Sequence, residues 1–586
     1  MAQIMTREQA AALIQDGDTV VITGSGGGVM EAYHTLEGIE ERFLNTGHPA
    51  NLTLVHASGI GDKNRAGVTR FAHKGMVRRV IGGHWGWSPE MQAMAVNNEI
   101  EAYNFSQGVI CHLYREIAAQ RPVLITKVGK YTFVDPLLQG GKLNEVTKED
   151  LVEHIKIHDV DYLMYKTFPV NIAVIRGTYA DESGNISFDQ EPARLDMLEA
   201  AQAAHNSGGK VICQVKGIVA KGSLSAKRVW IPGAYIDAIV VDPAQMQTGE
   251  GEYNPAFSGD VTIPISQLKA FPLNARKVVA RRAFMELEQG AIINLGFGMP
   301  DGVAAVAAEE GFADKVTMTI EQGIYGGIPA QGAIFGVASN PDAFLDESTQ
   351  FDFYSGHGLD TTFLGLAQAD AQGNVNVSKF GTTISGSGGF IDISQSAKKV
   401  VFCGTFTTGG LKTAIEDGRL VIQQEGRILY NTVKTLAMIY SLIAAAGAFA
   451  WMMAYLRIPA KFTGILMDVS DNKIVVLLLI NVLLLLLGCI MDMAPLILIM
   501  TPILLPVVQK FGMDPVQFGI MLIANLAIGL LTPPVGSCLY AGCAVGGAKI
   551  EKVTKCMLPF YLTMVIVLLM ITFIPALSMT LPNLMM

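Results

Sequence analysis

The chain of 586 residues is long enough for several domains, and its formal net charge of −9 combines two parts of opposite sign. Residues 428–586 carry eight Lys and Arg against five Asp and Glu, so residues 1–427 hold the whole acidic excess, together with all ten histidines. The acidic part has no basic cluster of the kind that binds phosphates, which argues against nucleic acid as a partner.

The seven cysteines follow no metal-binding or disulfide pattern. They form no CxxC pair, and no Cys/His group has zinc spacing, so no metal is predicted. So few cysteines in so long a chain indicate a reducing compartment. The first residues lack a basic stretch followed by an apolar run, so no signal peptide is predicted and residues 1–427 are expected in the cytoplasm. The cysteines are Cys111, Cys213, Cys403, Cys489, Cys538, Cys543 and Cys556.

Residues 1–427 alternate short β-type runs, glycine turns and helical stretches, which predicts an α/β fold. Segments of this region also resemble one another in the same order along the chain, which indicates two homologous α/β halves, 1–270 and 271–427. A site is then expected in the crevice between the halves, outside the carboxyl ends of strands. The matching segments are 23–30 with 295–303, 51–60 with 315–324, 171–186 with 361–375, and 233–241 with 389–401.

One difference between the halves points to chemistry. The second half has Glu321 at the end of an apolar strand, in TIEQG, where the first half has Ala57 in VHASG. Gly323, Gly326 and Gly327 follow Glu321 and leave room for a substrate to approach its oxygens. A capping or salt-bridged glutamate is the alternative interpretation.

Several strings, in order, resemble the class I CoA-transferases, close to the acetate or propionate CoA-transferase group. The resemblance runs from about residue 10 to residue 427, and both halves of that family here lie on one polypeptide. An ordered set of strings is far more specific than a single glycine-rich loop. The strings are TGSGGGVMEA (23–32), GGHWGWSP (82–89), TFVDP (132–136), GGKLNEVT (140–147), TIEQGIYGGI (319–328), GSGGFIDIS (386–394) and FCGTFT (402–407).

The resemblance implies a homo-oligomeric enzyme in which Glu321 is the nucleophile. It exchanges coenzyme A between acyl-CoA and carboxylic acid substrates by ping-pong chemistry and requires no further cofactor. The amides of Gly388 and Gly389 are candidates to stabilise an oxyanion, and Gly404 to contact coenzyme A. Plain tight turns are the alternative role for these glycines. The acyl pocket is assigned to Gly26, Gly27, Gly28 and His84, with simple packing as the alternative.

Residues 428–586 are predicted to form an all-α transmembrane segment. A bilayer core of about 30 Å takes roughly 20 apolar residues as a helix. Residues 474–491 and 557–579 have this character, 435–456 is a third candidate, and 518–531 is shorter. The segment implies a lipid membrane as partner and an inner or plasma membrane location.

Proline and glycine interrupt two apolar stretches of this segment, 493–506 and 528–536. Broken helices inside a membrane are typical of transporter sites, and Asp492, Asn525 and Thr532 lie at or near these breaks. Helix-end capping is the alternative role. The strings GCIMDMAP (488–495), MDPVQFGIM (513–521) and GLLTPPVG (529–536) resemble the C-terminal end of the large permease subunit of tripartite ATP-independent periplasmic (TRAP) transporters. That subunit has two inverted halves, and only the end of the second is recognisable.

The join near residue 428 has no Gly/Ser-rich or Pro-rich linker, and CoA-transferases continue well beyond the position of Arg427. A truncated second half loses packing that a domain needs. The missing linker favours an accidental join over an evolved two-domain architecture. The first functional hypothesis is a membrane-tethered CoA-transferase. The alternatives are a component of a TRAP-type sodium-coupled carboxylate transporter, an acyl-CoA hydrolase, and a non-functional fusion.

Overall fold

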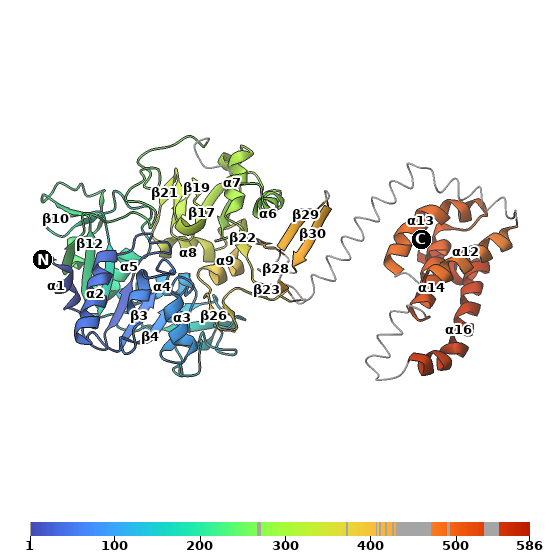
Figure 1. Cartoon of the computed structure of the whole chain (residues 1–586), viewed down its shortest axis with the longest axis horizontal. Coiled ribbons are helices and arrows are strands. Elements are labelled where there is room, and N and C mark those ends of the chain that lie inside the picture. Colours follow the sequence, from blue (N-terminus) through green and yellow to red (C-terminus); the bar gives the residue numbers. More distant parts are fainter. Residues whose placement is uncertain are drawn as a thin grey trace. The chain divides into compact units, whose positions relative to one another are not determined.

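The computed structural model separates into two compact units, Met1–Tyr430 and Asn431–Met586, and each is described by itself (Figure 1). The described residues are 2–265, 271–370, 373–405, 407–408, 412–416, 419–424, 427–428, 470, 472–488, 493–532 and 550–585. The predicted domain limits 1–270, 271–427 and 428–586 stay predictions.

The first half is built on an eight-stranded parallel sheet in the order β1-β15-β12-β9-β2-β3-β4-β5. The consecutive apolar residues of its central strands are typical of a parallel sheet that is buried on both faces. The strands are β1 (Gln3–Met5), β2 (Thr19–Ile22), β3 (Leu52–His56), β4 (Val77–Gly82), β5 (Glu101–Asn104), β9 (Ile172–Arg176), β12 (Lys210–Val215) and β15 (Ala238–Val241).

Helices cover both faces of this sheet. Val20 and Ile22 of β2 pack into one apolar cluster with α1 (Arg7–Ala11), α2 (Tyr33–Thr46) and α3 (Pro89–Val96). Val21 points the other way, because side chains alternate along a strand. It joins a cluster with α4 (Gln107–Ala118) and α5 (Met197–Asn206), and this cluster continues into the second half of the unit.

Two smaller sheets, β13-β10-β11-β14 and β6-β8-β7, extend the first half. Their strands are β6 (Val123–Thr126), β7 (Val152–Ile157), β8 (Val160–Lys166), β10 (Tyr179–Asp181), β11 (Ile186–Ser187), β13 (Gly217–Val219) and β14 (Val229–Ile231).

The second half repeats the design on a smaller sheet, in the order β21-β18-β17-β16-β22-β27. Its four strands β17, β16, β22 and β27 are parallel, and β18 and β21 pair antiparallel at the β17 side. The strands are β16 (Ile292–Leu295), β17 (Thr317–Ile320), β18 (Ile324–Tyr325), β21 (Ala343–Phe344), β22 (Thr361–Gly365) and β27 (Lys399–Cys403). The helices are α6 (Ala275–Phe284), α7 (Gly302–Glu309), α8 (Glu347–Ser355) and α9 (Phe390–Ser396).

The strand orders correct one of the four sequence matches. The run β12-β9-β2-β3 of the first half corresponds to β27-β22-β16-β17 of the second half. Since β27 lies beside β22 as β12 lies beside β9, β27 is the counterpart of β12, and the match of 233–241 with 389–401 is wrong. Within the described residues, the second sheet has no strand in the place of β15.

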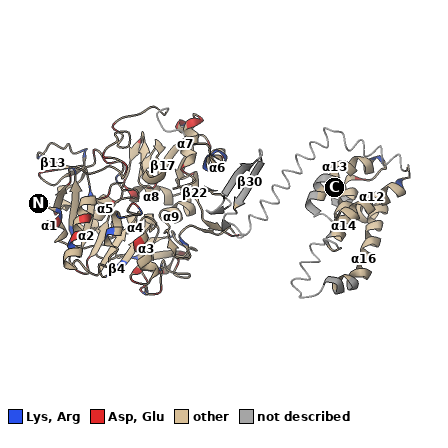
Figure 2. Cartoon of the chain, in the orientation of Figure 1, with Lys and Arg blue, Asp and Glu red and all other residues tan. Residues whose placement is uncertain are grey.

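The second unit consists of helices, and Figure 2 shows few charged residues on it. The described helices of this unit are α12 (Lys473–Gly488), α13 (Met493–Lys510), α14 (Pro515–Leu530), α16 (Ile550–Phe573) and α17 (Pro575–Met585). Apolar side chains of α12, α13, α14 and α16 form one cluster. Among the residues that the structure describes, no helix combines the length and the apolar character required to span a membrane.

Candidate active site

A cavity of about 420 Å³ lies where the two halves of the first unit meet. Its lining comes from segments that directly follow the carboxyl ends of parallel strands in both sheets. Ser58 and Gly59 follow β3, His84 follows β4, and Glu321 follows β17. The loop 386–389 before α9 completes one wall. The crevice that the internal repeat predicted is therefore present.

Glu321 is the first residue after β17, as Ala57 is the first residue after β3. The turn behind it requires glycine at position 323. Gly323 has φ +88°, and a Cβ there would lie 2.1 Å from the carbonyl oxygen of Leu345. Glu321 is half-buried at the cavity wall. Loss of solvation raises the pKa of Glu321 to about 7, although its own backbone amide and Asn294 partly oppose this rise.

Asn294 lies on β16, beside β17, and its side chain contacts the Glu321 carboxylate. Its Nδ2 donates to Glu321 Oε2 at 3.4 Å and to the Tyr354 hydroxyl oxygen at 3.4 Å. The Tyr354 hydroxyl in turn donates to Thr319 Oγ1 at 2.9 Å, and the Thr362 hydroxyl donates to Asn294 Oδ1 at 3.0 Å. These buried partners fix the orientation of the Asn294 side chain.

The glycine loop contributes backbone groups of two kinds. Gly388 has φ +52°, and its amide donates to the carbonyl oxygen of Gly83 at 2.8 Å, so this amide is already engaged. Gly389 is the N-cap residue of α9 and also lines the cavity. Among the described residues, the Gly389 amide has no hydrogen-bond acceptor. Of the two predicted oxyanion donors, Gly389 is therefore the one with a free N–H.

His84 lies in the cavity wall beside the glycine loop. Burial, and then the nearby His56 and Lys63, lower the pKa of His84 to about 4, so the ring is neutral at pH 7. The Gly86 amide donates to His84 Nδ1 at 3.2 Å, which assigns the ring proton to Nε2. His84 thus keeps Nε2–H as a hydrogen-bond donor without carrying charge.

Of the remaining predicted glycines, one lines the main cavity and three do not. Gly26 lines the cavity, where a Cβ would lie 2.1 Å from the ring of Trp87. Gly27 and Gly28 are not among its lining residues, and they pack on backbone of Ala333 and Gly249 instead. Gly28 borders a separate cavity of about 190 Å³. Gly404 follows β27 and is not among the described residues that line the main cavity.

Sequence reasoning missed several polar residues of the cavity, and Gln107 and Lys63 are two of them. Gln107 is the first residue of α4, and its Nε2 donates to Glu347 Oε1. Lys63 is the one lysine or arginine among the described lining residues, and its Nζ lies 4.8 Å from the Trp87 ring centroid and 5.8 Å from that of Phe297. Gln107 lies three residues after β5 and Lys63 seven residues after β3, so the comparison of strand ends that singled out Glu321 did not reach them.

The predicted permease residues lie in the second unit, where the structure describes two of them. Asn525 of α14 donates through Nδ2 to the backbone oxygen of Asn481 at 3.1 Å and to Asn481 Oδ1 at 2.9 Å, which ties α14 to α12. The Thr532 hydroxyl donates to the carbonyl oxygen of Ile528. Asp492 lies outside the described residues.

Outside the cavity, one buried set of donor atoms could hold a cation. Cys111, Asp196 and Glu347 each offer a ligand atom, and these atoms lie within 4.8 Å of one another.

Two family models match different parts of the chain. Residues 4–242 match "Coenzyme A transferase", and residues 387–577 match "Tripartite ATP-independent periplasmic transporter, DctM component". The second match begins inside the glycine loop, although α9 and β27 belong to the first unit.

The acetate CoA-transferase YdiF of Escherichia coli K12 is 46% identical over 426 residues, 72% of this chain and 80% of that protein. The solved thioester complex with CoA of the acyl-CoA transferase YdiF from E. coli O157:H7 has a TM-score of 0.69 and 44% identity. The match covers 73% of this chain and 81% of that chain.

The sialic acid TRAP transporter large permease SiaM of Vibrio cholerae is 38% identical over 165 residues, 28% of this chain. The chain thus spans 39% of the length of that permease.

Proposed function

Because the chain belongs to the coenzyme A transferase family, we propose that it transfers coenzyme A from a short-chain acyl-CoA to a carboxylic acid through a thioester on Glu321. Acetate and propionate are the proposed type of acid. The observation that carries the proposal is the position of Glu321, which is half-buried at the wall of the cavity. Among the described lining residues, Glu321 is the one acidic residue.

The proposed reaction proceeds by two exchanges at Glu321. The carboxylate attacks the thioester carbon, the C–S bond breaks, and coenzyme A leaves as a thiolate from the acyl-glutamyl anhydride. The thiolate then attacks the glutamyl carbonyl of this anhydride, which releases the donor acid as its carboxylate and leaves glutamyl-CoA. An incoming carboxylate reverses both steps, so every bond broken is replaced by one of the same kind. This divides one difficult exchange into easier ones.

Each attack places negative charge on a carbonyl oxygen, which needs a hydrogen-bond donor. The free amide of Gly389 and the Nε2–H of neutral His84 are suitable donors on the cavity wall. The solved thioester complex with CoA of the E. coli relative supports a covalent intermediate here. Coenzyme A itself is a substrate, and energy is conserved in the thioester, so the proposed reaction needs no ATP.

Exchange of labelled acetate into acetyl-CoA tests the proposal. Glu321→Ala is expected to abolish exchange, and Glu310→Ala is the control, because Glu310 is an acidic residue at the end of α7 that pairs with Arg281 on the surface. Full exchange by Glu321→Ala would remove Glu321 from the reaction. Release of free thiol without an acceptor acid would instead support acyl-CoA hydrolysis.

For the second unit we propose membrane attachment, with the enzymatic part in the cytoplasm. The match to the DctM component and the apolar helices α12, α13, α14 and α16 support this proposal. A TRAP-type transport function is the alternative. Since the match covers 39% of a large permease, sodium-dependent uptake of carboxylate into liposomes that contain only this chain is expected to be absent. Such uptake would favour the transport function.

A further inference from the structure

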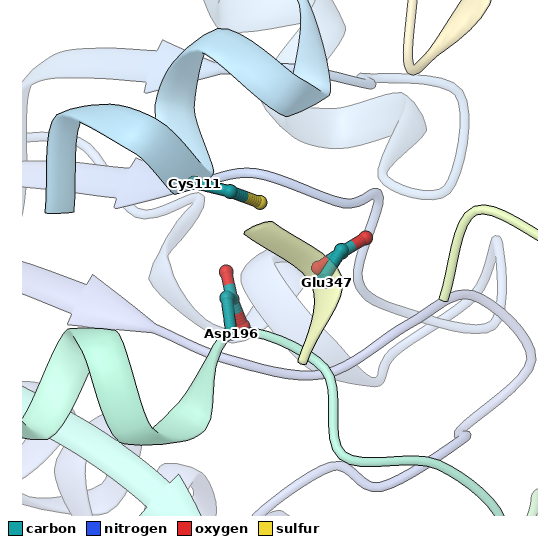
Figure 3. A group of neighbouring side chains, drawn as sticks. All are labelled: Cys111, Asp196 and Glu347. Atoms are coloured by element: carbon teal, nitrogen blue, oxygen red, sulfur yellow. The ribbon is translucent and has the colours of Figure 1, made fainter. Parts of the chain in front are cut away.

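Side chains from α4, α5 and α8 meet at one buried point of the first unit (Figure 3). Helices α4 and α5 come from the first half, and α8 comes from the second. Cys111 lies on α4, Asp196 is the N-cap residue of α5, and Glu347 is the first residue of α8. All three side chains are buried, and their donor atoms lie within 4.8 Å of one another.

The hydrogen bonds of Glu347 leave one of its oxygens without a partner. Oε1 accepts from Gln107 Nε2, and the Glu347 backbone amide donates to the carbonyl oxygen of Leu195 at 2.9 Å. Oε2 is fully buried and has no hydrogen-bond partner in the described part of the chain. A buried ionised oxygen without a donor is costly, whereas a protonated oxygen becomes a donor itself. One carboxyl oxygen of Asp196 lies within 4.8 Å of one carboxyl oxygen of Glu347, so Asp196 is the neighbouring acceptor.

The charges around Glu347 favour the same protonation state. The titratable groups that face it are Asp196 on α5, Cys111 and Tyr114 on α4, and Glu321 after β17, and none of them is a cation. Burial, and then the charge of Asp196, raise the pKa of Glu347 well above its usual range. Burial also raises the pKa of Asp196. Two neighbouring buried carboxylates do not both ionise near neutral pH.

We propose that Glu347 and Asp196 share one proton across the seam between the two halves of the first unit, and that Glu347 is thereby the positioning residue that holds the Gln107 amide in the cavity of Glu321. The inference rests on the proposed function for the role of the cavity. Gln107 is fixed at two points of the second half, since its backbone amide donates to the carbonyl oxygen of Gly388 at 2.9 Å and its side chain donates to Glu347. Both anchors join the first half to the loop and helix that border the nucleophile.

A divalent cation is the competing explanation for this cluster. It would require an ionised Cys111 thiol, but burial raises the pKa of that thiol well above its usual range. It would bind at the unpartnered Glu347 Oε2 and would itself have to displace the thiol proton of Cys111. Metal analysis of the purified chain therefore decides between the cation and the shared proton.

Three variants test the proposal. Glu347→Gln imitates a protonated glutamate, because its amide can accept from Gln107 and donate to Asp196. Glu347→Leu removes both hydrogen bonds. Glu199→Gln is the matched control, since Glu199 is a buried carboxyl of α5 in the same seam that accepts from Ser348 and does not contact Gln107.

We expect kcat of CoA exchange to fall roughly 10- to 100-fold in Glu347→Leu while KM changes little. Glu347→Gln and Glu199→Gln are expected to stay within about 3-fold of the unchanged protein. At alkaline pH the unchanged protein should lose kcat as the shared proton leaves, and Glu347→Gln should lack this decline. A Glu347→Gln variant as impaired as Glu347→Leu would overturn the proposal.

Infrared spectroscopy of the folded full chain provides a test that does not depend on activity. The carbonyl band of a protonated carboxylic acid should be present at neutral pH and decrease in Glu347→Gln. Its absence, or a stoichiometric divalent metal that Glu347→Gln loses, would contradict the shared proton. If the unchanged chain forms no CoA adduct on Glu321, the proposed function fails, but the infrared result still decides on the proton.

Discussion

Asn294 Nδ2 donates a 3.4 Å hydrogen bond to Glu321 Oε2 from the adjacent strand of the second sheet. It is the one side chain among the described residues that donates to this carboxylate. Burial raises the pKa of Glu321, the Glu321 backbone amide and then Asn294 lower it, and the net value is about 7. Burial, the backbone amide and Asn294 together set the pH at which the proposed nucleophile becomes available.

The first prediction concerns the pH dependence of the first half-reaction. Only the carboxylate form of Glu321 can attack a thioester, and its pKa is about 7. The value of kcat/KM for acetyl-CoA should therefore rise with pH through about 7 and level off before the alkaline decline expected from loss of the shared proton. Stopped-flow measurement of CoA adduct formation checks this expectation. A rate that is constant from about pH 5 to 8 would show that ionisation of Glu321 does not limit the attack.

Loss of the Asn294 amide should shift this profile. In Asn294→Leu the hydrogen bond that stabilises the carboxylate is lost, so the midpoint is expected to move upward by about one pH unit. Asn206→Leu is the control, since the Asn206 amide at the end of α5 donates to the carbonyl oxygen of Ala118, far along the chain from Glu321. An unchanged midpoint in Asn294→Leu would contradict the role given to Asn294.

Substitution of Gly26 should disturb the cavity through Trp87. A Cβ at Gly26 would lie 2.1 Å from the Trp87 ring, which must then move, and both residues line the cavity. We expect Gly26→Ala to lower kcat/KM by roughly 10-fold or more. Gly251→Ala is the control, because nothing lies within 4 Å of a Cβ there. Equal effects of the two substitutions would exclude the Trp87 contact as the cause.

Stability of the first unit should decrease as the pH rises. Burial raises the pKa of Glu31 to about 8 and also raises the pKa values of Glu199, Glu347 and Asp196. Groups with a raised folded-state pKa bind more protons in the folded state, so their stabilising contribution is present below the unfolded value and is lost as pH rises through the folded value. The melting temperature from calorimetry should be lower at pH 9 than at pH 6.

The same experiment on Glu31→Gln isolates one of these groups. The variant has no proton to lose at this position, so its melting temperature should fall less between pH 6 and pH 9. An identical decrease in both proteins would mean that Glu31 does not titrate with the raised pKa.

Membrane attachment predicts a simple fractionation result. After expression of the full chain, the protein should stay in the membrane pellet when the pellet is washed with alkaline carbonate, because apolar helices hold it there. Release of the chain into the supernatant would contradict attachment through the second unit.

Much of the site could be predicted from the sequence because it follows from a local rule. Comparison of the halves singled out Glu321, and the structure has it after β17 where Ala57 follows β3. The glycine loop and His84 also lie on the predicted crevice.

The features that the sequence did not predict depend on contacts between segments that are distant along the chain. The strands β15 and β27 resemble each other in composition, but their neighbours in the sheet differ, and only the strand order reveals this. The bond between Gln107 and Glu347 joins residues 240 positions apart, and no local pattern predicts it.

Peptide mapping of the full chain after incubation with acetyl-CoA tests the central claim most directly. The peptide that contains Glu321 should gain the mass of coenzyme A less water, and borohydride should reduce this adduct. Coenzyme A found on another residue, or no adduct in a protein that still exchanges labelled acetate, would contradict the account.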